Sequence, residues 1–140
     1  MLFRSEEDSI LINLWISPNK KILYKRIYRA TENGDKASDF HRLCDNKGPT
    51  LIIIKTGEEN IIGGFSEAKW KKNEKCISDP NAFVFSLNQR QKYKTNKEKA
   101  LFWRIDYGPI FGDGKTFAIK IKDNILSNKE HWSRDRKSVV

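Results

Sequence analysis

The apolar run Leu-Ile-Ile-Ile at residues 51–54 most constrains what this chain can fold into. An unbroken run that is mostly β-branched is typical of a strand buried on both faces. Residues 61–65 follow after a short link, and we interpret them as the hairpin partner of this strand. Within the partner, Gly63 and Gly64 indicate a bulge, or a place where another backbone or a ring packs closely. A buried antiparallel hairpin is therefore expected near the centre of the fold.

A short helix is expected just before this hairpin, over residues 37–44. Phe40, Leu43 and Cys44 recur there at three- and four-residue spacing, which makes one apolar face. The turn residues of 45–49 end the helix, because a proline cannot continue it. Residues 40–65 thus form a helix-turn-hairpin unit, around which the rest of the chain is organised.

The remaining elements are less regular. Residues 9–16 fit either a helix capped by Asp8 or Ser9, or a strand. Further strands are expected over residues 21–30, 82–87, 100–105 and 116–122. A turn is expected over residues 31–35, a polar link over 88–99 and a glycine-rich loop over 107–114. Residues 66–81 are expected to form a mobile loop that Trp70 anchors. About six strands and two short helices with hairpin-length links predict a mainly β or α+β fold, a sandwich of two antiparallel sheets flanked by short helices.

Composition places the chain among globular proteins. Its 140 residues suffice for one domain, and 38% hydrophobic with 32% charged residues excludes a disordered composition. No apolar run approaches the ~20 residues of a membrane span. The N-terminus becomes acidic where a signal peptide would become apolar. We therefore expect an intracellular, cytoplasmic protein.

The net charge of +9 raises the question of a nucleic-acid partner. Lysines are scattered among acidic residues, however, and no basic helix or stripe stands out. An exposed Trp70 or Trp103 would be able to stack on bases, but Trp103 lies in a strand pattern and is expected in the core. A solvated lysine-rich surface, with an acidic protein or a membrane surface as its partner, is the preferred interpretation, and binding to nucleic acid is the weaker alternative.

Cys44 and His41 are the first candidates for chemistry. They lie three residues apart and share a helix face, as a nucleophile and its base would. Cys44 nevertheless belongs to the apolar stripe, where a thiol stays protonated and unreactive. Packing is its expected role. An enzyme that acts on oxidants through Cys44 or Cys76 is the alternative, and the cysteines and histidines show no metal-ligand spacing.

Other polar motifs are explained by turns. Five aspartates each sit beside a turn residue and fit capping roles: Asp39, Asp45, Asp79, Asp106 and Asp113. Gly114-Lys115-Thr116 imitates the end of a phosphate-binding loop, but it leads into a strand, so no helix N-terminus is offered to a phosphate. No catalytic residue, cofactor site or metal site is predicted.

Several blocks in order along the chain resemble the TLDc domain of the oxidation-resistance proteins. The blocks are residues 39–55, 62–65, 79–87 and 107–112, together with Trp70, and the opening around residues 9–14 and 23–30 also fits. The residues that carry the resemblance, with structural roles, are Phe40, Cys44, Asp45, Gly48, Pro49, Thr50, Gly63, Gly64, Trp70, Phe83, Phe85, Tyr107, Gly108, Pro109, Phe111 and Gly112.

The resemblance implies a β-sandwich, protection against oxidative stress, and binding to the vacuolar proton pump, the V-ATPase, as a regulatory module without an agreed active site. It divides the chain into an N-terminal extension (1–8), a TLDc-like domain (9–122) and a divergent C-terminal segment (123–140). Thr116-Phe117 stands where the family pattern carries an aspartate-leucine pair. Residues 134–140 are basic and not strand-like. The last family strand is therefore expected to be either missing or supplied differently, leaving a sheet edge open.

Overall fold

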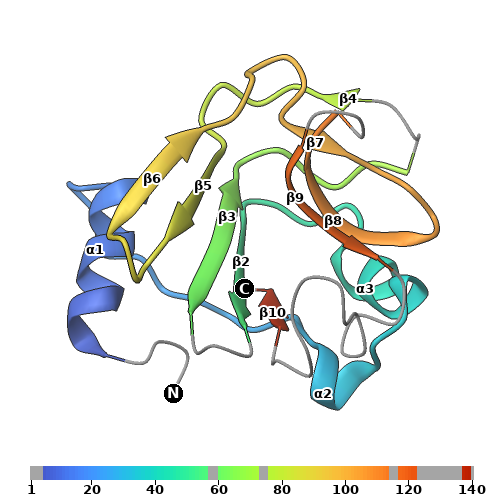
Figure 1. The fold of residues 1–140 in the computed structure, drawn as a ribbon, viewed down its shortest axis with the longest axis horizontal. Coiled ribbons are helices and arrows are strands. Elements are labelled where there is room, and N and C mark those ends of the chain that lie inside the picture. Colours follow the sequence, from blue (N-terminus) through green and yellow to red (C-terminus); the bar gives the residue numbers. More distant parts are fainter. Residues whose placement is uncertain (1–4, 57–59, 73–75, 114–116, 123–136, 140) are drawn as a thin grey trace.

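Two antiparallel sheets form the framework of the computed structural model, which describes residues 5–56, 60–72, 76–113, 117–122 and 137–139 (Figure 1). In spatial order, the six-stranded sheet contains β1 (Tyr28–Arg29), β10 (Lys137–Val139), β2 (Thr50–Lys55), β3 (Ile61–Ser66), β5 (Phe83–Ser86) and β6 (Gln91–Lys94). The four-stranded sheet contains β4 (Cys76–Ile77), β7 (Leu101–Phe102), β8 (Tyr107–Gly112) and β9 (Phe117–Lys122). The helices are α1 (Glu6–Ile16), α2 (Ala30–Asn33) and α3 (Ala37–Cys44). The expected mainly β architecture of two antiparallel sheets is confirmed.

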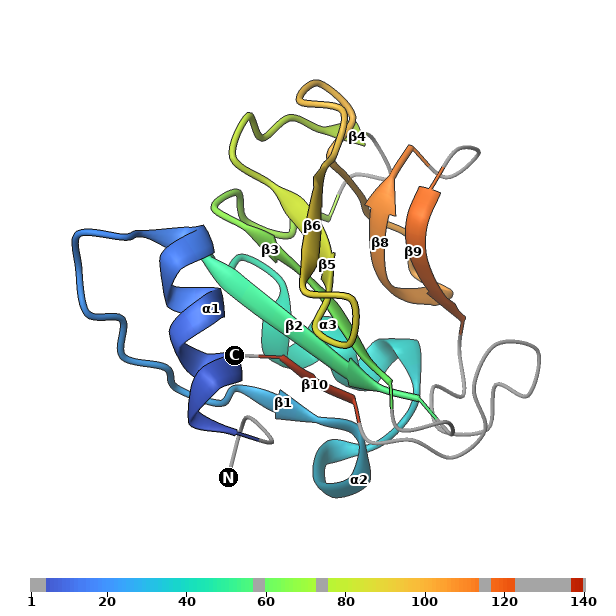
Figure 2. The ribbon, with the colours of Figure 1, turned by 60° about the vertical axis from the view of Figure 1, so that its left-hand side comes forward.

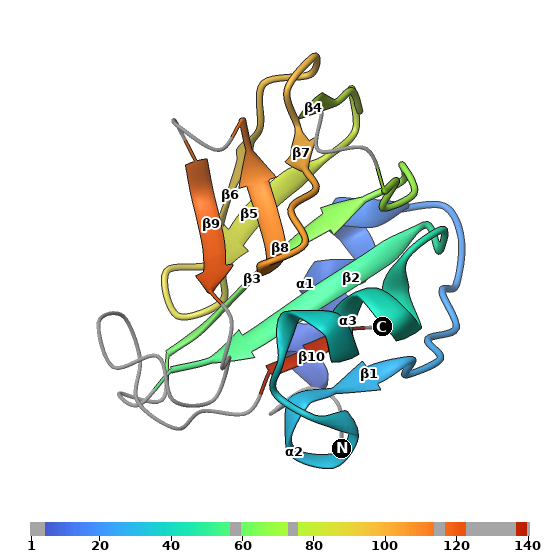
Figure 3. The same cartoon turned by 90° about the vertical axis from the view of Figure 1, so that its right-hand side faces the viewer.

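Strand β2 is buried on both faces, as its apolar run predicts. Leu51 and Ile53 face a core that α1 closes, whereas Ile52 and Ile54 face a second core, shared with α3 and the four-stranded sheet. Helices α1 and α3 therefore cover opposite faces of the six-stranded sheet (Figures 2 and 3). Burial on both sides is why the strand needs no polar residue between its ends.

The β2–β3 hairpin has the expected partners, with Thr50 opposite Ser66 and Lys55 opposite Ile61. Gly63 and Gly64 allow the close packing that their sequence suggests. A Cβ atom on Gly64 would lie 2.5 Å from the Phe111 ring of the other sheet, and one on Gly63 would collide with the carbonyl oxygen of Ile52. Glycine at position 64 thus lets the two sheets approach each other.

Helix α3 has the predicted bounds, but α1 differs from its prediction. The cap of α1 is Ser5, whose hydroxyl accepts a hydrogen bond from the backbone amide of Asp8 at 3.2 Å. The expected cap, Asp8, is buried and pairs with Arg90. Residues 9–16 are helical, so the strand alternative was wrong. The caps Asp8 and Ser9 were also wrong, because the helix begins earlier, at an acidic first turn that directly follows Ser5. No helix among the described residues is long and apolar enough to cross a membrane.

The strand expected over residues 21–30 is reduced to β1. Residues 21–27 belong to no strand, and the Leu23 side chain is 87% exposed. The turn expected at residues 31–35 begins instead as the short helix α2, although Gly34 has the positive φ foreseen for this region. Apolar residues at 22, 23 and 27 gave a strand-like pattern, yet only Tyr28 and Arg29 meet a partner strand.

Four strands were missed, and three of them (β4, β6 and β8) lie in segments that were expected to be links or loops. Strand β6 lies in the supposed link 88–99 and pairs with β5 through its backbone, while all four of its side chains are exposed. Strand β8 lies in the supposed glycine loop, between β7 and β9. Strand β4 closes the edge beside β7. The strand expected over residues 100–105 is only Leu101–Phe102, whereas β9 confirms the strand expected at 116–122 over its described residues.

Residues 134–140 were interpreted as not strand-like, and for residues 137–139 this was wrong, because they form strand β10. Lys137 pairs with Ile54 and Val139 with Ile52, and on its other side β10 pairs with β1. Strand β10 therefore covers the edge of β2 that faces away from β3. Three residues are too few to show the two-residue period of a strand in the sequence. Residues 137–139 form a strand because their main chain pairs with β1 on one side and with β2 on the other.

Candidate functional site

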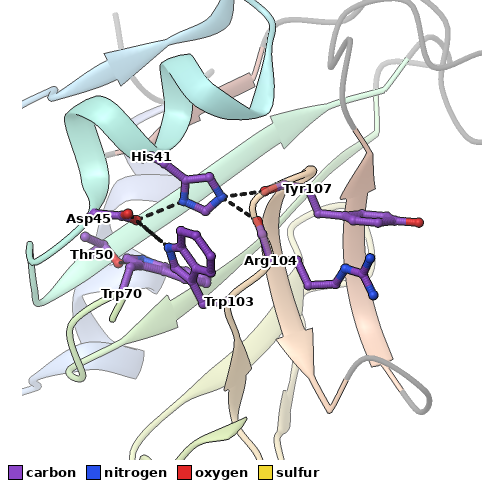
Figure 4. A network of polar contacts seen from close by, with 7 residues as sticks. All are labelled: His41, Asp45, Thr50, Trp70, Trp103, Arg104 and Tyr107. Carbon is purple, nitrogen blue, oxygen red and sulfur yellow. Dashed lines mark hydrogen bonds and ion pairs between the residues drawn. The ribbon is translucent and has the colours of Figure 1, made fainter. Parts of the chain in front are cut away.

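The end of α3 meets the turn between β7 and β8 at a polar network inside an otherwise apolar region (Figure 4). Phe40 and Cys44 point from α3 into the core, and this rotates His41 toward the turn. The His41 side chain is only 9% exposed. A nearly buried imidazole needs hydrogen-bond partners on its ring nitrogens.

Both ring nitrogens of His41 face acceptors. Nδ1 lies 2.9 Å from a carboxylate oxygen of Asp45, and Nε2 lies 2.7 Å from each of the carbonyl oxygens of Arg104 and Tyr107. A carboxylate and a carbonyl only accept, so both nitrogens donate when all these bonds are made. These contacts join α3 to the β7–β8 turn.

Asp45 also accepts hydrogen bonds from Trp103, which directly follows β7. The indole Nε1 of Trp103 donates to both carboxylate oxygens at 3.0 Å, and its ring lies 4.6 Å from the ring of His41. The Asp45 carboxylate thus lies between an imidazole and an indole N–H. Both carboxylate oxygens of Asp45 already accept hydrogen bonds within the protein, which leaves them little capacity to accept one from a substrate.

Trp70 secures the turn that follows α3. Its fully buried indole donates to the Thr50 hydroxyl at 3.0 Å, and its carbonyl accepts from the Asn46 amide at 2.8 Å. Its ring packs edge-on against Phe40 and Phe111, at 5.7 Å from each. Trp70 was suggested as an exposed stacking residue, and that suggestion was wrong because the turn and both sheets enclose it. Trp103 is buried, as expected.

Cys44 does not pair with His41. The thiol is fully buried in the core between α3 and the two sheets, and the nitrogens of His41 bind other groups. Burial raises the pKa of Cys44, and the nearby Asp45 carboxylate raises it further. A thiol in this position stays protonated. Cys76 is exposed.

The other carboxylates hold local structure. Asp79 is buried, and its Oδ2 accepts from the Ser66 hydroxyl at 2.9 Å and from the amides of Glu67 and Ala68 at 2.7 and 3.0 Å. Asp39 accepts from the amide of Lys36 at the start of α3. Hydrogen bonds from Arg104 lower the pKa of Asp106, and Asp113 lies 4.0 Å from Lys99. Among the described residues, no three acidic, histidine or cysteine side chains come together as a metal site would require.

Comparison with known proteins identifies the family. The family model described as the TLDc domain matches residues 4–138. The chain belongs to the TLDc family. The match begins at residue 4 and reaches into β10, so it includes all three helices.

Relatives of this TLDc domain are larger proteins. Xenopus laevis "MTOR-associated protein MEAK7" is 33% identical over 54 residues, which are 36% of this chain and 12% of the relative. The Danio rerio protein of the same name is 25% identical over 64 residues, which are 46% of this chain and 14% of the relative. Xenopus tropicalis "TBC1 domain family member 24" is 28% identical over 67 residues, or 44% and 12% of the two chains. The chain thus spans less than a fifth of the length of these relatives.

The residues that carry the TLDc resemblance fall in different parts of the fold. Five of them gather around the end of α3: Phe40, Cys44, Asp45, Thr50 and Trp70. Five lie on β8, where the ring of Phe111 reaches the same core: Tyr107, Gly108, Pro109, Phe111 and Gly112. Phe83 and Phe85 lie in the core on the α1 side. Gly63 and Gly64 lie between the cores, and Gly48 and Pro49 line a surface groove.

Sequence reasoning missed the network around His41. The four-residue spacing of His41 and Asp45 on a helix was a usable signal, since such residues face each other. Trp103 and the two carbonyl groups come from residues some sixty positions away and left no local signal.

Proposed function

We propose that this TLDc domain is a noncatalytic regulatory module that works inside the cell by binding a protein partner, and that this partner is the V-ATPase. Membership of the TLDc family supports the proposal, because the family resemblance implies pump binding and protection against oxidative stress. Pump binding is the direct activity in this proposal, and oxidative-stress protection is its consequence for the cell.

One observation favours a binding role over catalysis. The polar groups nearest to a catalytic constellation, His41 and Asp45, are bound to one another, to Trp103 and to backbone carbonyls. A general base must have a free position for the proton it removes. His41 and Asp45 instead connect α3 to the four-stranded sheet, a structural task.

The named relatives offer a second partner class. Two of them carry the name "MTOR-associated protein MEAK7". Each shares only a short segment with this chain, so association with mTOR ranks below the V-ATPase in our proposal. The same capture experiment distinguishes the two.

The test uses the purified chain immobilised on beads and detergent-solubilised vacuolar membranes. We expect V-ATPase subunits to be recovered above the level of beads that carry an unrelated protein of the same net charge. That control matters because a net charge of +9 attracts acidic proteins without specificity. Recovery of no V-ATPase subunit above the control would reject the pump as partner, and recovery of mTOR instead would favour the second class.

The enzyme alternative is tested separately by peroxide consumption. If the domain removes peroxide through its thiols, the variant with Cys44→Ser and Cys76→Ser must lose the activity. We expect no consumption above buffer by the wild-type chain, because the Cys44 thiol is buried and protonated. Thiol-dependent consumption would contradict the noncatalytic proposal.

A further inference from the structure

The segment of residues 17–27 connects α1 to β1 and loops outward from the end of α1 before it returns to the sheet (Figure 2). Residues 21–27 belong to no strand. Tyr24 holds the segment to α1, because its hydroxyl donates to the Asn13 side chain at 2.6 Å. The adjacent Leu23 side chain is 87% exposed. The segment is therefore fixed to the helix while its leucine lies in water.

Exposed apolar side chains gather in this part of the molecule. A single exposed apolar residue is ordinary in folded proteins. Among the described residues, however, three of the five large apolar side chains that are exposed belong to α1 or to the segment that follows it: Ile10, Leu14 and Leu23. Ile10 and Leu14 lie one turn apart on one face of α1, and they line a hollow together with residues 17–21. Such a concentration is typical of a surface that contacts another molecule.

The same segment is basic and contains no acidic residue. Its basic residues are all exposed: Lys20, Lys21, Lys25 and Arg26. Arg26 pairs with Glu32 at 2.6 Å, whereas no salt bridge among the described residues engages the three lysines. The lysines that flank Leu23 in the sequence are thus available to anionic groups outside the protein.

The acidic side chains near the segment do not cancel its charge. Glu6 and Glu7 are exposed in the first turn of α1, whereas the segment leaves from the last turn. Glu67 lines a groove beside the segment, but Lys47 lines it as well, and the Glu67 carboxylate accepts a hydrogen bond from the Asn81 side chain at 2.9 Å. The charge that a flat surface meets at the segment is therefore mainly positive.

We propose that the segment of residues 17–27 docks the domain on a bilayer that contains anionic phospholipids. Leu23 enters the boundary between headgroups and acyl chains, and the three lysines meet the phosphate groups. Burial of the leucine and attraction of the lysines act together, because one short apolar contact alone binds a membrane only weakly. The inference goes beyond the proposed function, since the ligand is the lipid surface and not the pump.

A bilayer suits this segment better than a nucleic acid or an acidic protein. A nucleic acid would meet the lysines but leave Leu23 in water, and the one aromatic ring of the segment, Tyr24, is partly buried and bonded to Asn13. An acidic protein would need an apolar pocket that matches the leucine. A bilayer accepts any apolar side chain that projects far enough, and its anionic headgroups surround that side chain on all sides.

The first test is flotation of the full chain with phosphatidylcholine vesicles that contain about one third phosphatidylserine. We expect saturable binding that weakens at least about tenfold in the variant K20E/K21E/K25E. The matched control K92E/K94E/K97E makes the same change in net charge on or just after β6, and α1 lies between this strand and the segment (Figures 2 and 3). Its binding should stay within about twofold of the wild type. Equal weakening in both variants, or equal binding to vesicles of phosphatidylcholine alone, would overturn the proposal.

A second test separates insertion of Leu23 from charge attraction. Leu23→Ser should weaken vesicle binding at least about fivefold. The matched control is Ile105→Ser on the β7–β8 turn, because Ile105 is also a large exposed apolar residue, and this variant should bind as the wild type does. Equal effects of the two substitutions would overturn the insertion.

A fluorophore that responds to its surroundings shows the insertion directly. It is attached to Leu23→Cys in a Cys76→Ser background, where the buried Cys44 stays unlabelled. We expect its emission to shift to the blue when the phosphatidylserine vesicles are added, and we expect no shift for the same probe on Ile105→Cys. A probe at position 23 that stays in water while the vesicles are bound would contradict the proposal.

Pump capture is measured in detergent, without a bilayer, so the two proposals fail separately. If vesicles bind as expected and no V-ATPase subunit is captured, the membrane inference stands and the pump is rejected as partner. If the pump is captured and vesicles are not bound, the membrane inference is wrong and pump binding stands. Loss of capture in K20E/K21E/K25E, without vesicle binding by the wild type, would assign the lysines to an acidic protein surface instead.

Discussion

His41 and Asp45 lie one turn apart at the end of α3, and their side chains meet at 2.9 Å between Nδ1 and Oδ1. Through this pair the helix is joined to Trp103 and to the carbonyl groups of Arg104 and Tyr107. The bonds connect a helix that packs on the six-stranded sheet to the four-stranded sheet. The pair is thus a polar link between layers that also meet through apolar side chains, among them Phe40 and Phe111.

Replacing His41 by alanine should destabilise the domain by about 1–3 kcal/mol, because it removes the hydrogen bonds of a nearly buried ring to Asp45 and to the carbonyl groups of Arg104 and Tyr107. Urea denaturation gives the change in the free energy of unfolding. Arg42→Ala is the matched control on the same helix, since Arg42 is exposed and only loosely paired with Asp39, and it should change stability by less than about 1 kcal/mol. Equal losses in the two variants would show that His41 is not a link.

Gly64→Ala should destabilise by at least about 2 kcal/mol, because the new methyl group would lie 2.5 Å from the ring of Phe111. Phe111→Leu alone should also destabilise the domain, because it removes part of a buried ring. In the double variant the two effects should be less than additive, since the smaller side chain makes room for the methyl group. Thermal or urea unfolding of all four proteins measures this coupling, and strict additivity would contradict the contact between the sheets.

Thiol labelling should distinguish the two cysteines. At neutral pH an alkylating reagent should modify Cys76 in the folded protein and leave Cys44 unmodified, because burial and the Asp45 charge raise the pKa of Cys44. Mass spectrometry after digestion locates the label, and both thiols should react in denaturant. Rapid labelling of Cys44 in the folded C76S variant would revive the nucleophile interpretation.

Stability should fall in alkaline solution partly because of Tyr24. Burial raises the pKa of its phenol from 10.0 to about 12, and the hydroxyl donates to the Asn13 side chain at 2.6 Å. Between these two values the unfolded chain loses the proton while the folded chain keeps it, so the free energy of unfolding decreases as the pH rises. Tyr24→Phe should show a shallower decrease over pH 10 to 12. A slope identical to that of the wild type would contradict the burial of the phenol, and the buried Tyr28 accounts for part of what remains.

Some elements were predictable because their own residues bury apolar surface. Helix α3 carries Phe40 and Cys44 on one face, and β2 is a continuous apolar run, so each shows its period within a few residues. Gly63 and Gly64 indicated close packing for a similar reason, since a strand interior keeps glycine where a larger side chain has no room.

Other elements had no such period. Strand β8 contains two glycines and a proline, which suggest a loop, yet β7 and β9 pair with it on either side. The polar network around His41 was also predictable only in part. His41 and Asp45 were within reach of helix spacing, whereas Trp103 and the Arg104 and Tyr107 carbonyls join them only after the chain folds back.

The sequence was enough to predict the family, the buried hairpin and the helix before it, because side-chain burial repeats along the chain with the period of the element. The strands β6 and β10, and the absence of a strand over residues 21–27, became evident only from the folded structure. Every residue except proline offers the same backbone donor and acceptor, so main-chain pairing leaves little trace in the order of side chains.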